Sequence, residues 1–371
     1  MLSQWRLSRR FCSRPTTAVI WIFVLVSGLT GCTPDRPKDP PAAVEPEQPS
    51  TSIASLELGG KIFGTTWSVK ARGQALDQRS LLEAIEAEFE AINQGMSTWR
   101  KDSQISQFNE GPAGSYRFNE QAVEVIKLAF AVAKATGGAF EPTVGPLIRL
   151  WGFGAGAQTA APTPAALAAA RAAVGYQKLS WGLDGSLLKP EAAINLDLSA
   201  VAKGYAVDRV ASLVKAQGAA HGLVEIGGEV VAWGSRPQGG AWKLAVDAPV
   251  DNAAPGQRFA AIVKLYNKAM ATSGDYRQFR MENGRRVQHI VDPRTGEPVD
   301  HGLASVTVVA PDCASADAYA TALMVLGVKE GVALVDSLPR VDALFLERQA
   351  KGWRQVRTRN MHKYLIRNPG E

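Results

Sequence analysis

Helical and extended hydrophobic patterns both occur along this chain of 371 residues. Between Gln78 and Asn93, the apolar residues fall on one face of a helix: Leu81, Leu82, Ile85, Phe89 and Ile92. A second helix is predicted from Asn119 to Thr136, where two glycines end it. The Ala-rich stretch 155–175 predicts a third, peripheral helix that begins at Thr163-Pro164.

Short strands separated by glycine pairs account for most of the remaining pattern. Two strands are predicted within 53–71 around Gly59-Gly60, and two within 222–234 around Gly227-Gly228. Further elements are expected in chain order: strands at 242–247, 259–266, 268–272, 287–291 and 303–310, a helix from Ser315 to Gly327, and a helix–strand–strand passage at 329–357. This mixed order predicts the α+β class, with mixed or antiparallel sheets flanked by helices rather than a doubly wound parallel sheet.

The stretch from Ile194 to Gly218 combines a predicted strand, a turn and a helix. Ile194–Leu198 is expected to be a short buried strand, and Ser199 is expected to cap the helix. Free backbone N–H groups and the positive dipole end at such a turn bind anions. Asp197 precedes the turn and Lys203 lies one helical turn inside it, which suits a phosphorylated ligand with or without a divalent cation. A capped helix with a surface ion pair would give the same pattern.

Two loops carry aromatic residues in polar or irregular surroundings. Residues 96–109 are too polar for a core and too aromatic for a plain linker, which suits a ligand surface. Residues 140–154 are so rich in Gly, Pro and aromatic residues that no regular element is expected there. Trp151 and Phe153 could form a wall against a flat ring system or simply cover the core.

Candidate metal-binding and catalytic residues occur in the last third of the sequence. Asp317 and Thr321 are four residues apart on a helix, so both can reach one Mg²⁺; capping and packing would explain them equally. His289, just before the turn that starts at Asp292, could be a general base or could bond a turn carbonyl. The sequence has no P-loop and no H-E-x-x-H motif. The glycines at 152–156 follow no strand–helix pattern and make a poor dinucleotide fingerprint.

The basic composition comes largely from the N-terminus. The formal net charge is +6 and the pI is 9.2. Residues 1–31 contain four arginines and no acidic residue, so the remainder carries 6 − 4 = +2. No run of Lys and Arg with interleaved aromatic residues occurs, so nucleic-acid binding has little support.

Residues 1–31 have the features of a lipoprotein signal peptide. A positive region precedes the nine-residue apolar run Ala18–Val26, which is too short to span a bilayer stably. Leu29-Thr30-Gly31-Cys32 resembles a bacterial lipobox, which implies cleavage before Cys32 and its lipidation. An ordinary signal peptide that ends beside a cysteine is the alternative. Thr33, in place of Asp, favours sorting to the outer membrane.

The chain thus divides into three predicted segments. Residues 1–31 are the signal peptide, 32–52 form a disordered tether rich in Pro and charge, and 53–371 form one domain. Of the three cysteines, Cys12 leaves with the signal peptide and Cys32 would be lipidated. Only Cys313 remains, which excludes an internal disulfide and a Cys-based metal site.

Eight motifs, in order between about residues 56 and 358, resemble those of the ApbE family of FAD:protein FMN transferases. They are F-G-T-T-W (63–67), M-S-T-W-R-K-D-S-Q-I-S-Q-F-N (96–109), F-E-P-T-V-G-P-L (140–147) with L-W-G-F-G (150–154), L-D-L-S-A-V-A-K-G-Y-A-V-D (196–208), V-E-I-G-G-E (224–229), A-T-S-G-D-Y (271–276), H-I-V-D-P-R-T-G (289–296) and A-D-A-Y-A-T-A (316–322). The resemblance implies a single ApbE-like domain. The lipobox fits it, since many members are periplasmic lipoproteins.

The resemblance also implies a flavin site and a metal site. FAD contacts are expected from Phe63, Trp99, Ala139, Phe140, Glu141, Asp197, Lys203 and Val291. Among these, Trp99 stands at the ring-stacking position, Phe63 replaces the usual Met, and Glu141 replaces the commoner Asp. Mg²⁺ is expected to bind the backbone carbonyl of Ala200 and the side chains of Asp317 and Thr321, while Ala320 stands where some members have a further Asp. His289 is the candidate base, which Asp292 would orient.

The implied reaction is a phosphoryl transfer. A Thr or Ser hydroxyl of an acceptor protein attacks the FMN-side phosphorus of FAD, and AMP leaves. Family acceptors carry a Gly-Ala-Thr/Ser core that this chain lacks, so another protein is expected, such as a subunit of an Nqr- or Rnf-type membrane redox complex. The expected location is the periplasm, with a lipid anchor. Two alternatives stay open: an FAD pyrophosphatase that produces FMN and AMP, and a non-catalytic FAD-binding lipoprotein.

Overall fold

An eight-stranded antiparallel sheet organises the part of the chain that the computed structural model describes, which is 54–154, 157, 162–250, 256–275, 279–282 and 285–366. In spatial order its strands are β1 (Ala54–Ile62), β2 (Thr65–Gly73), β6 (Ala219–Ile226), β7 (Glu229–Trp233), β10 (Lys268–Gly274), β15 (Leu303–Ala310), β16 (Asp342–Arg348) and β17 (Trp353–Arg357). All seven neighbouring pairs run antiparallel, which confirms the predicted α+β class. The predicted signal peptide, Cys32 and the tether lie outside the described residues.

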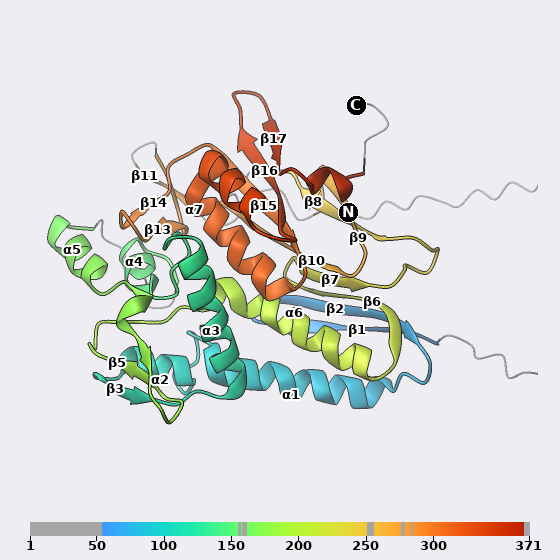
Figure 1. Cartoon of the computed structure of the whole chain (residues 1–371), viewed down its shortest axis with the longest axis horizontal. Coiled ribbons are helices and arrows are strands. Elements are labelled where there is room, and N and C mark those ends of the chain that lie inside the picture. The colour runs from blue at the N-terminus through green and yellow to red at the C-terminus, as the bar shows by residue number, and fades with distance from the viewer. Residues whose placement is uncertain are drawn as a thin grey trace, which may run out of the picture. The chain divides into compact units, whose positions relative to one another are not determined.

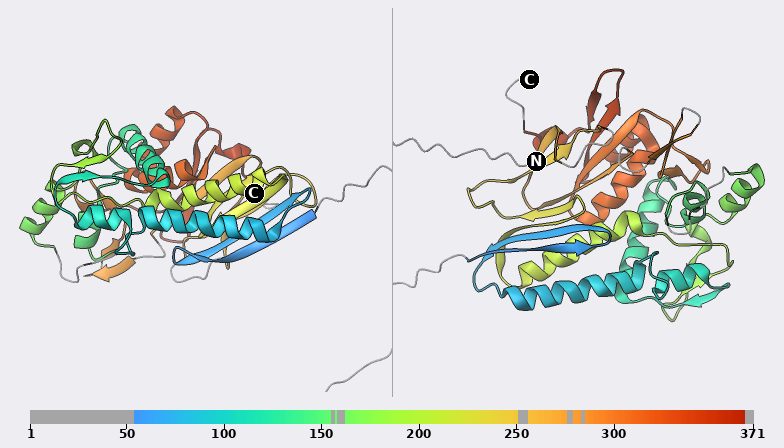
Figure 2. Two further views of the ribbon diagram at one scale, coloured as in Figure 1. Left: turned by 90° about the horizontal axis from the view of Figure 1, so that it is seen from below. Right: turned by 180° about the vertical axis from the view of Figure 1, so that it is seen from behind.

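Seven helices accompany the sheet in these residues: α1 (Gln78–Met96), α2 (Gln104–Glu110), α3 (Glu120–Ala135), α4 (Gly145–Leu150), α5 (Pro164–Ala172), α6 (Ser199–Ala216) and α7 (Cys313–Ser337). Figures 1 and 2 show α1 and α6 running side by side across β1, β2 and β6. Helix α7 packs on α6 and against β10 and β15. The two helices thereby meet over the middle of the sheet.

The central strands are buried on both faces. In β6, Val224 packs toward the helices, whereas the adjacent Leu223 packs toward the hairpin of β8 (Trp242–Asp247) and β9 (Phe259–Leu265). Successive side chains of a strand point to opposite faces, so helices cover one face and the hairpin covers the other. This double burial explains why β7 and β15 are buried and mostly apolar along their whole length rather than alternating.

Smaller pairings complete the described part. These are the three-stranded sheet of β3 (Gly114–Tyr116), β5 (Leu187–Lys189) and β4 (Ser180–Trp181), and the hairpins β11 (Phe279–Glu282) with β12 (Arg285–Gln288) and β13 (Val291–Asp292) with β14 (Glu297–Pro298). Two short 3₁₀ turns, η1 (Tyr176–Lys178) and η2 (Met361–Lys363), occur as well. Among the helices above, only α7 is long and apolar enough to cross a membrane, and half of that stretch is buried within the domain, as in a core helix.

Several predicted elements have the expected place but other boundaries. The first hairpin does not turn at Gly59-Gly60, which lie within β1; it turns at Phe63-Gly64, both with positive φ (51° and 74°). Gly59 and Gly60 instead allow close packing, because a Cβ on Gly60 would lie 2.8 Å from the indole nitrogen of Trp67. The strand pair around Gly227-Gly228 is confirmed.

Other predictions were wrong in detail. Residues 96–109 are not one loop, since α2 begins within them, capped by Ser103. Residues 140–154 contain the short helix α4, whose Pro146 lies in the first turn, where a missing N–H costs nothing. Helix α7 is capped by Asp312 rather than Ser315, and it continues beyond a kink at Gly327 (φ 71°, ψ −176°). Asn119 and Thr163, the predicted starts of two other helices, are the N-caps of α3 and α5, which begin one residue later.

Candidate functional site

A cavity of about 450 Å³ opens where α6 and α7 meet the start of β7 and the second half of β10. It receives side chains from segments far apart in the sequence, including 139–148, 197–203, 227–229, 245–247, 270–274, 289–293 and 317–325. Its volume lies in the range typical of small-molecule and cofactor sites. Ten of the thirteen residues predicted to bind or react line it: Ala139, Phe140, Glu141, Asp197, Ala200, Lys203, His289, Val291, Asp317 and Thr321.

The entry to α6 is held by side chains rather than by a strand. Ile194–Leu198 was predicted to be a strand, but it pairs with no other strand in the described residues. Instead, Asn109 binds Leu196 twice, accepting from its N–H (2.7 Å) and donating to its carbonyl (2.8 Å). The side chain of Asn109 therefore pairs with the N–H and the carbonyl of Leu196, the two backbone groups that a neighbouring strand would otherwise bind.

Asp197 and Ser199 form the turn into α6. Asp197 Oδ1 accepts from the Ser199 N–H (3.0 Å) and from its hydroxyl (2.6 Å). The N-cap position belongs to Leu198, which has no side-chain cap, so the prediction that Ser199 caps the helix was wrong. The first turn of α6, which includes Ala200, lines the cavity, although the N–H groups of Ser199, Val201 and Ala202 already donate to oxygens of the turn.

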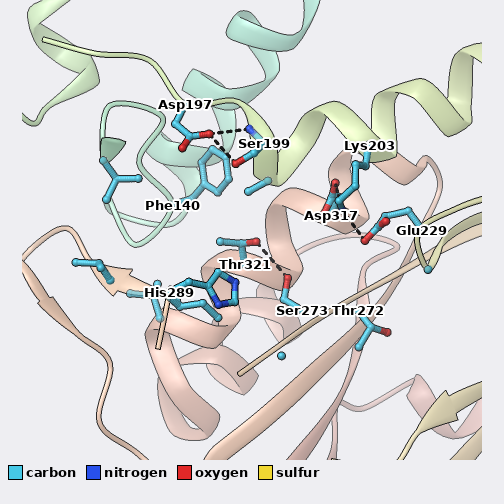
Figure 3. Close-up of a pocket in the computed structure, with 18 of the residues that line it drawn as sticks. Phe140, Asp197, Ser199, Lys203, Glu229, Thr272, Ser273, His289, Asp317 and Thr321 are labelled. Atoms are coloured by element: carbon cyan, nitrogen blue, oxygen red, sulfur yellow. Dashed lines mark hydrogen bonds and ion pairs between the residues drawn. The ribbon is translucent and has the colours of Figure 1, made fainter. Parts of the chain in front are cut away.

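Lys203 joins two carboxylates across the cavity (Figure 3). Its Nζ lies 2.8 Å from Glu229 Oε1 and 3.7 Å from Asp317 Oδ2. Burial by itself would lower the pKa of Lys203, but the charges of Asp317 and Glu229 outweigh burial and raise it, so the side chain stays an ammonium. Both carboxylate side chains are only 4% exposed, so water screens this cluster weakly.

Gly204 explains how Lys203 and Asp317 come so close. A Cβ at this position would lie 2.3 Å from the carbonyl oxygen of Cys313, so α6 and α7 touch backbone to backbone here. The Gly204 N–H donates to Asp317 Oδ2 (3.1 Å). In a regular helix the Gly204 N–H donates to the carbonyl of Ala200. Asp317 therefore reaches the part of α6 that carries this carbonyl, which was predicted to be a metal ligand.

Thr321 lies one turn beyond Asp317 on α7, and His289 lies between β12 and β13; both face the cavity (Figure 3). The spacing of four residues does place Asp317 and Thr321 in the same cavity. The Thr321 hydroxyl lies 3.1 Å from that of Ser273 on β10. His289 was predicted to lie on a strand, but it lies at the bend between β12 and β13. The centroid of its ring is 6.3 Å from that of Phe153.

The opposite wall comes from the segment after α3. Phe140 is buried beneath the cavity, and Glu141 closes a loop. Glu141 Oε1 accepts from the N–H and hydroxyl of Thr143 (2.9 and 2.7 Å) and from the N–H of Tyr176 (3.0 Å). Burial raises the pKa of Glu141, and these hydrogen bonds act in the opposite direction. The longer side chain, compared with Asp, thus reaches backbone amides of its own wall.

Three predicted residues do not line the cavity. Phe63 packs its ring against Phe89 (5.6 Å). Trp99 is 76% exposed at the end of α1. Asp292 accepts bonds from Arg294 at 2.9 and 3.0 Å, which engages its carboxylate in the β13–β14 turn.

Two of the lining residues that the sequence left without a role contact the predicted ones. Glu229 and Ser273 each stood in a quoted motif but were given no function. Only the pairing of β7 with β10 and the packing of α7 bring them beside Lys203 and Thr321. No group of three or more His, Cys, Asp or Glu side chains arranged for a metal occurs in the described residues, so a cation here would rely on mixed oxygen ligands.

Comparisons with known proteins agree with this geometry. The sequence model of the ApbE family matches residues 63–345 of this chain. A FAD:protein FMN transferase of Vibrio cholerae is 35% identical over 325 residues, covering 86% of this chain and 94% of that protein. One from Haemophilus influenzae is 39% identical over 286 residues, covering 73% and 81%.

Solved structures give the same result. The flavin transferase ApbE from Vibrio cholerae superposes with a TM-score of 0.75 at 34% identity, covering 84% of this chain and all of that one. The apo flavinyl transferase ApbE of Pseudomonas stutzeri gives 0.76 at 34% identity, with 84% and 96% covered. On its sequence, its fold and the relatives it matches, this chain belongs to the ApbE family.

Proposed function

We propose that this protein transfers FMN from FAD to a Thr or Ser hydroxyl of an acceptor protein. The hydroxyl oxygen forms a bond to the FMN-side phosphorus, the bond from that phosphorus to the oxygen bridging to AMP breaks, and AMP leaves with that oxygen while the hydroxyl loses its proton. The observation that carries the proposal is the joint presence of Lys203, Asp317, Thr321 and His289 in one cavity of a member of a flavin transferase family.

Lys203 and the first turn of α6 suit the pyrophosphate of FAD. The ammonium provides a compact charge, and the positive end of the helix dipole at the start of α6 favours an anion. Asp197 carries a negative charge, but its Oδ1 is occupied by Ser199. We expect Asp197 to shape the turn and to meet hydrogen-bond donors of the ligand rather than its phosphate oxygens.

The residues present fit Mg²⁺. The hard oxygen atoms of Asp317, Thr321 and the Ala200 carbonyl are the ligand types that this ion prefers, and the Lys203 ammonium already lies beside one of them. Oε2 of Glu229 is buried without a hydrogen-bond partner among the described residues, which leaves one further oxygen acceptor of the cluster open. When bound there, Mg²⁺ would supply positive charge to the pyrophosphate.

His289 is our candidate for the group that removes the acceptor's proton. It faces the cavity from the side opposite Lys203, so an acceptor hydroxyl could enter between His289 and a phosphorus held near α6 (Figure 3). A base within hydrogen-bond reach contributes roughly 10²–10⁴-fold to such a reaction. Because the carboxylate of Asp292 accepts from Arg294, we do not propose that it orients His289.

The predicted acceptor, location and anchor remain part of the proposal. An acceptor with a Gly-Ala-Thr/Ser core, on an Nqr- or Rnf-type redox subunit, would meet the enzyme at the periplasmic membrane surface. Lipidation of Cys32, with outer-membrane sorting favoured by Thr33, would hold the domain there through the 32–52 tether. Support for these points comes from sequence motifs alone.

To test this proposal, the purified protein is incubated with FAD and Mg²⁺, with and without an acceptor domain that carries a Gly-Ala-Thr core. An acceptor that gains the mass of one FMN while AMP is released in step supports the transferase, and Asp317→Ala should abolish both. Release of AMP without labelling would instead support the FAD pyrophosphatase. Tightly bound FAD that stays unchanged for hours would leave a flavin-binding lipoprotein.

A further inference from the structure

Glu229, the first residue of β7, has no role assigned so far. Its side chain is 4% exposed and reaches into the cavity, directly after the turn at Gly227-Gly228. Oε1 contacts the Lys203 ammonium at 2.8 Å, and Oε2 has no hydrogen-bond partner among the described residues. A buried carboxylate with one unsatisfied oxygen costs free energy, which the contact with Lys203 offsets in part.

The distances within the cluster show which carboxylate holds the lysine. The 2.8 Å contact to Glu229 is a charge-assisted hydrogen bond, whereas the 3.7 Å separation from Asp317 is too long for one. Asp317 receives its hydrogen bond from the Gly204 N–H instead. Lys203 is therefore drawn to the β7 side of the cavity, away from the face of Asp317 that Thr321 shares.

The charge balance gives this placement a consequence. With both carboxylates ionised, the cluster has a formal charge of −1. Burial raises the pKa of Glu229 to about 7, and the charge of Lys203 opposes that rise. Without Glu229, the pair of Lys203 and Asp317 would be neutral, and the ammonium would be free to move onto Asp317. A divalent cation would then meet a carboxylate already occupied by a like charge, which disfavours its binding.

We propose that Glu229 is a positioning residue that holds the Lys203 ammonium off Asp317, so that Asp317 can bind a divalent cation. Lys203 stays close enough to meet phosphate, while the cation side of Asp317 remains open. The proposal deepens the proposed function, since it concerns the same metal site. It concerns cation binding alone, which can be measured without FAD and without an acceptor.

The test measures Mn²⁺ binding to the FAD-free protein by electron paramagnetic resonance, for the wild type, Glu229→Gln, Lys203→Met and the double variant. We expect Glu229→Gln to weaken Mn²⁺ binding by about tenfold or more, because Lys203 then pairs with Asp317. In the Lys203→Met background the same change should have at most about a twofold effect, since no ammonium remains to be held.

A matched control comes from the same hairpin. Glu225 on β6 accepts from the Gly228 N–H (2.8 Å) and does not line the cavity, so Glu225→Gln removes a nearby charge without touching Lys203. We expect it to change Mn²⁺ affinity by less than about twofold, since water screens charges at the surface. Glu229→Asp keeps the charge but shortens the reach to Lys203, so it should weaken binding almost as much as Glu229→Gln.

Equal effects of Glu229→Gln in both backgrounds would overturn the proposal, because Glu229 would then act through its own charge. Wild-type affinity in Glu229→Asp, or no Mn²⁺ binding by the wild type, would overturn it as well. If Glu229→Gln does not fold, the aspartate variant decides the question. Failure of the labelling assay with normal Mn²⁺ binding would count against the transferase and leave the role of Glu229 standing.

Discussion

Replacing Gly204 by alanine tests whether the contact between α6 and α7 builds the site. The added Cβ would lie 2.3 Å from the Cys313 carbonyl oxygen, 2.7 Å from its carbon and 2.9 Å from the Cα of Ala314. All three are backbone atoms, so no side-chain rotation can relieve the overlap. Ordinary contact begins at 3.4 Å, so the two helices must separate by roughly 1 Å.

The magnitude follows from two opposing effects. Overpacking of a close contact costs about 1–3 kcal/mol, and rigid backbone neighbours place this case at the upper end. Alanine is a better helix former than glycine by ~1 kcal/mol, which offsets part of that cost. We expect the free energy of unfolding to fall by about 2 kcal/mol. We also expect the hydrogen bond from the Gly204 N–H to Asp317 to break and the distance between Asp317 and Lys203 to change.

Urea unfolding compares Gly204→Ala with Gly302→Ala. A Cβ on Gly302 would have only ordinary contacts, at 3.7 Å from the Arg348 carbonyl and from Glu347, so this control should be neutral or stabilising by up to ~1 kcal/mol. Binding of Mn²⁺ and FAD, measured on the folded fraction, should weaken in Gly204→Ala alone. Wild-type stability and wild-type Mn²⁺ affinity in Gly204→Ala would refute the claim that this contact sets the site.

Three further predictions concern the reaction, the flavin and pH. His289→Ala should lower the rate of acceptor labelling by roughly 10²–10⁴-fold while the Kd for FAD stays within a factor of a few, and an unchanged rate would remove His289 as the base. Trp99→Ala should raise the Kd for FAD by about 5–150-fold, the loss of one stacked ring worth 1–3 kcal/mol, as followed by flavin fluorescence; an unchanged Kd would argue that this exposed ring does not meet the flavin. Burial raises the pKa of Asp208 from 3.8 to about 7, although the Cys313 and Ala314 N–H groups that it accepts from act to lower it. The folded state therefore holds this proton more tightly than the unfolded state, so Asp208 should make stability fall as pH rises from about 4 to about 7 and level off above, and Asp208→Asn should remove that part of the slope in urea unfolding measured across pH.

Local patterns were enough to locate most helices and strands. The apolar face of α1, the Asn119 and Thr163 caps and the turn at Gly227-Gly228 act over a few residues, so the sequence alone contains the physics that forms them. The error at the entry to α6 arose because a distant partner supplied the hydrogen bonds. Leu196 looked like a strand residue because it is buried, but its backbone bonds go to the side chain of Asn109.

The site shows the same division. Spacing by itself predicted that Asp317 and Thr321 share a helix face and that Lys203 lies one turn inside α6, and resemblance to a family made His289 the candidate base. Neither indicated that Glu229 holds Lys203, because that contact depends on β7 lying beside the α6–α7 crossing. Phe63 and Trp99 were named by resemblance as well, yet neither lines the cavity.

The sequence by itself thus determined the α+β class, the family and the helix that carries Asp317 and Thr321, since these follow from periodicity and from ordered motifs. Only the tertiary structure decided which charges meet. An ion pair such as Lys203–Glu229 joins residues whose separation along the chain says nothing about their distance in space. That distance is set by the close approach of α6 to α7 at Gly204 and by the order of strands in the sheet.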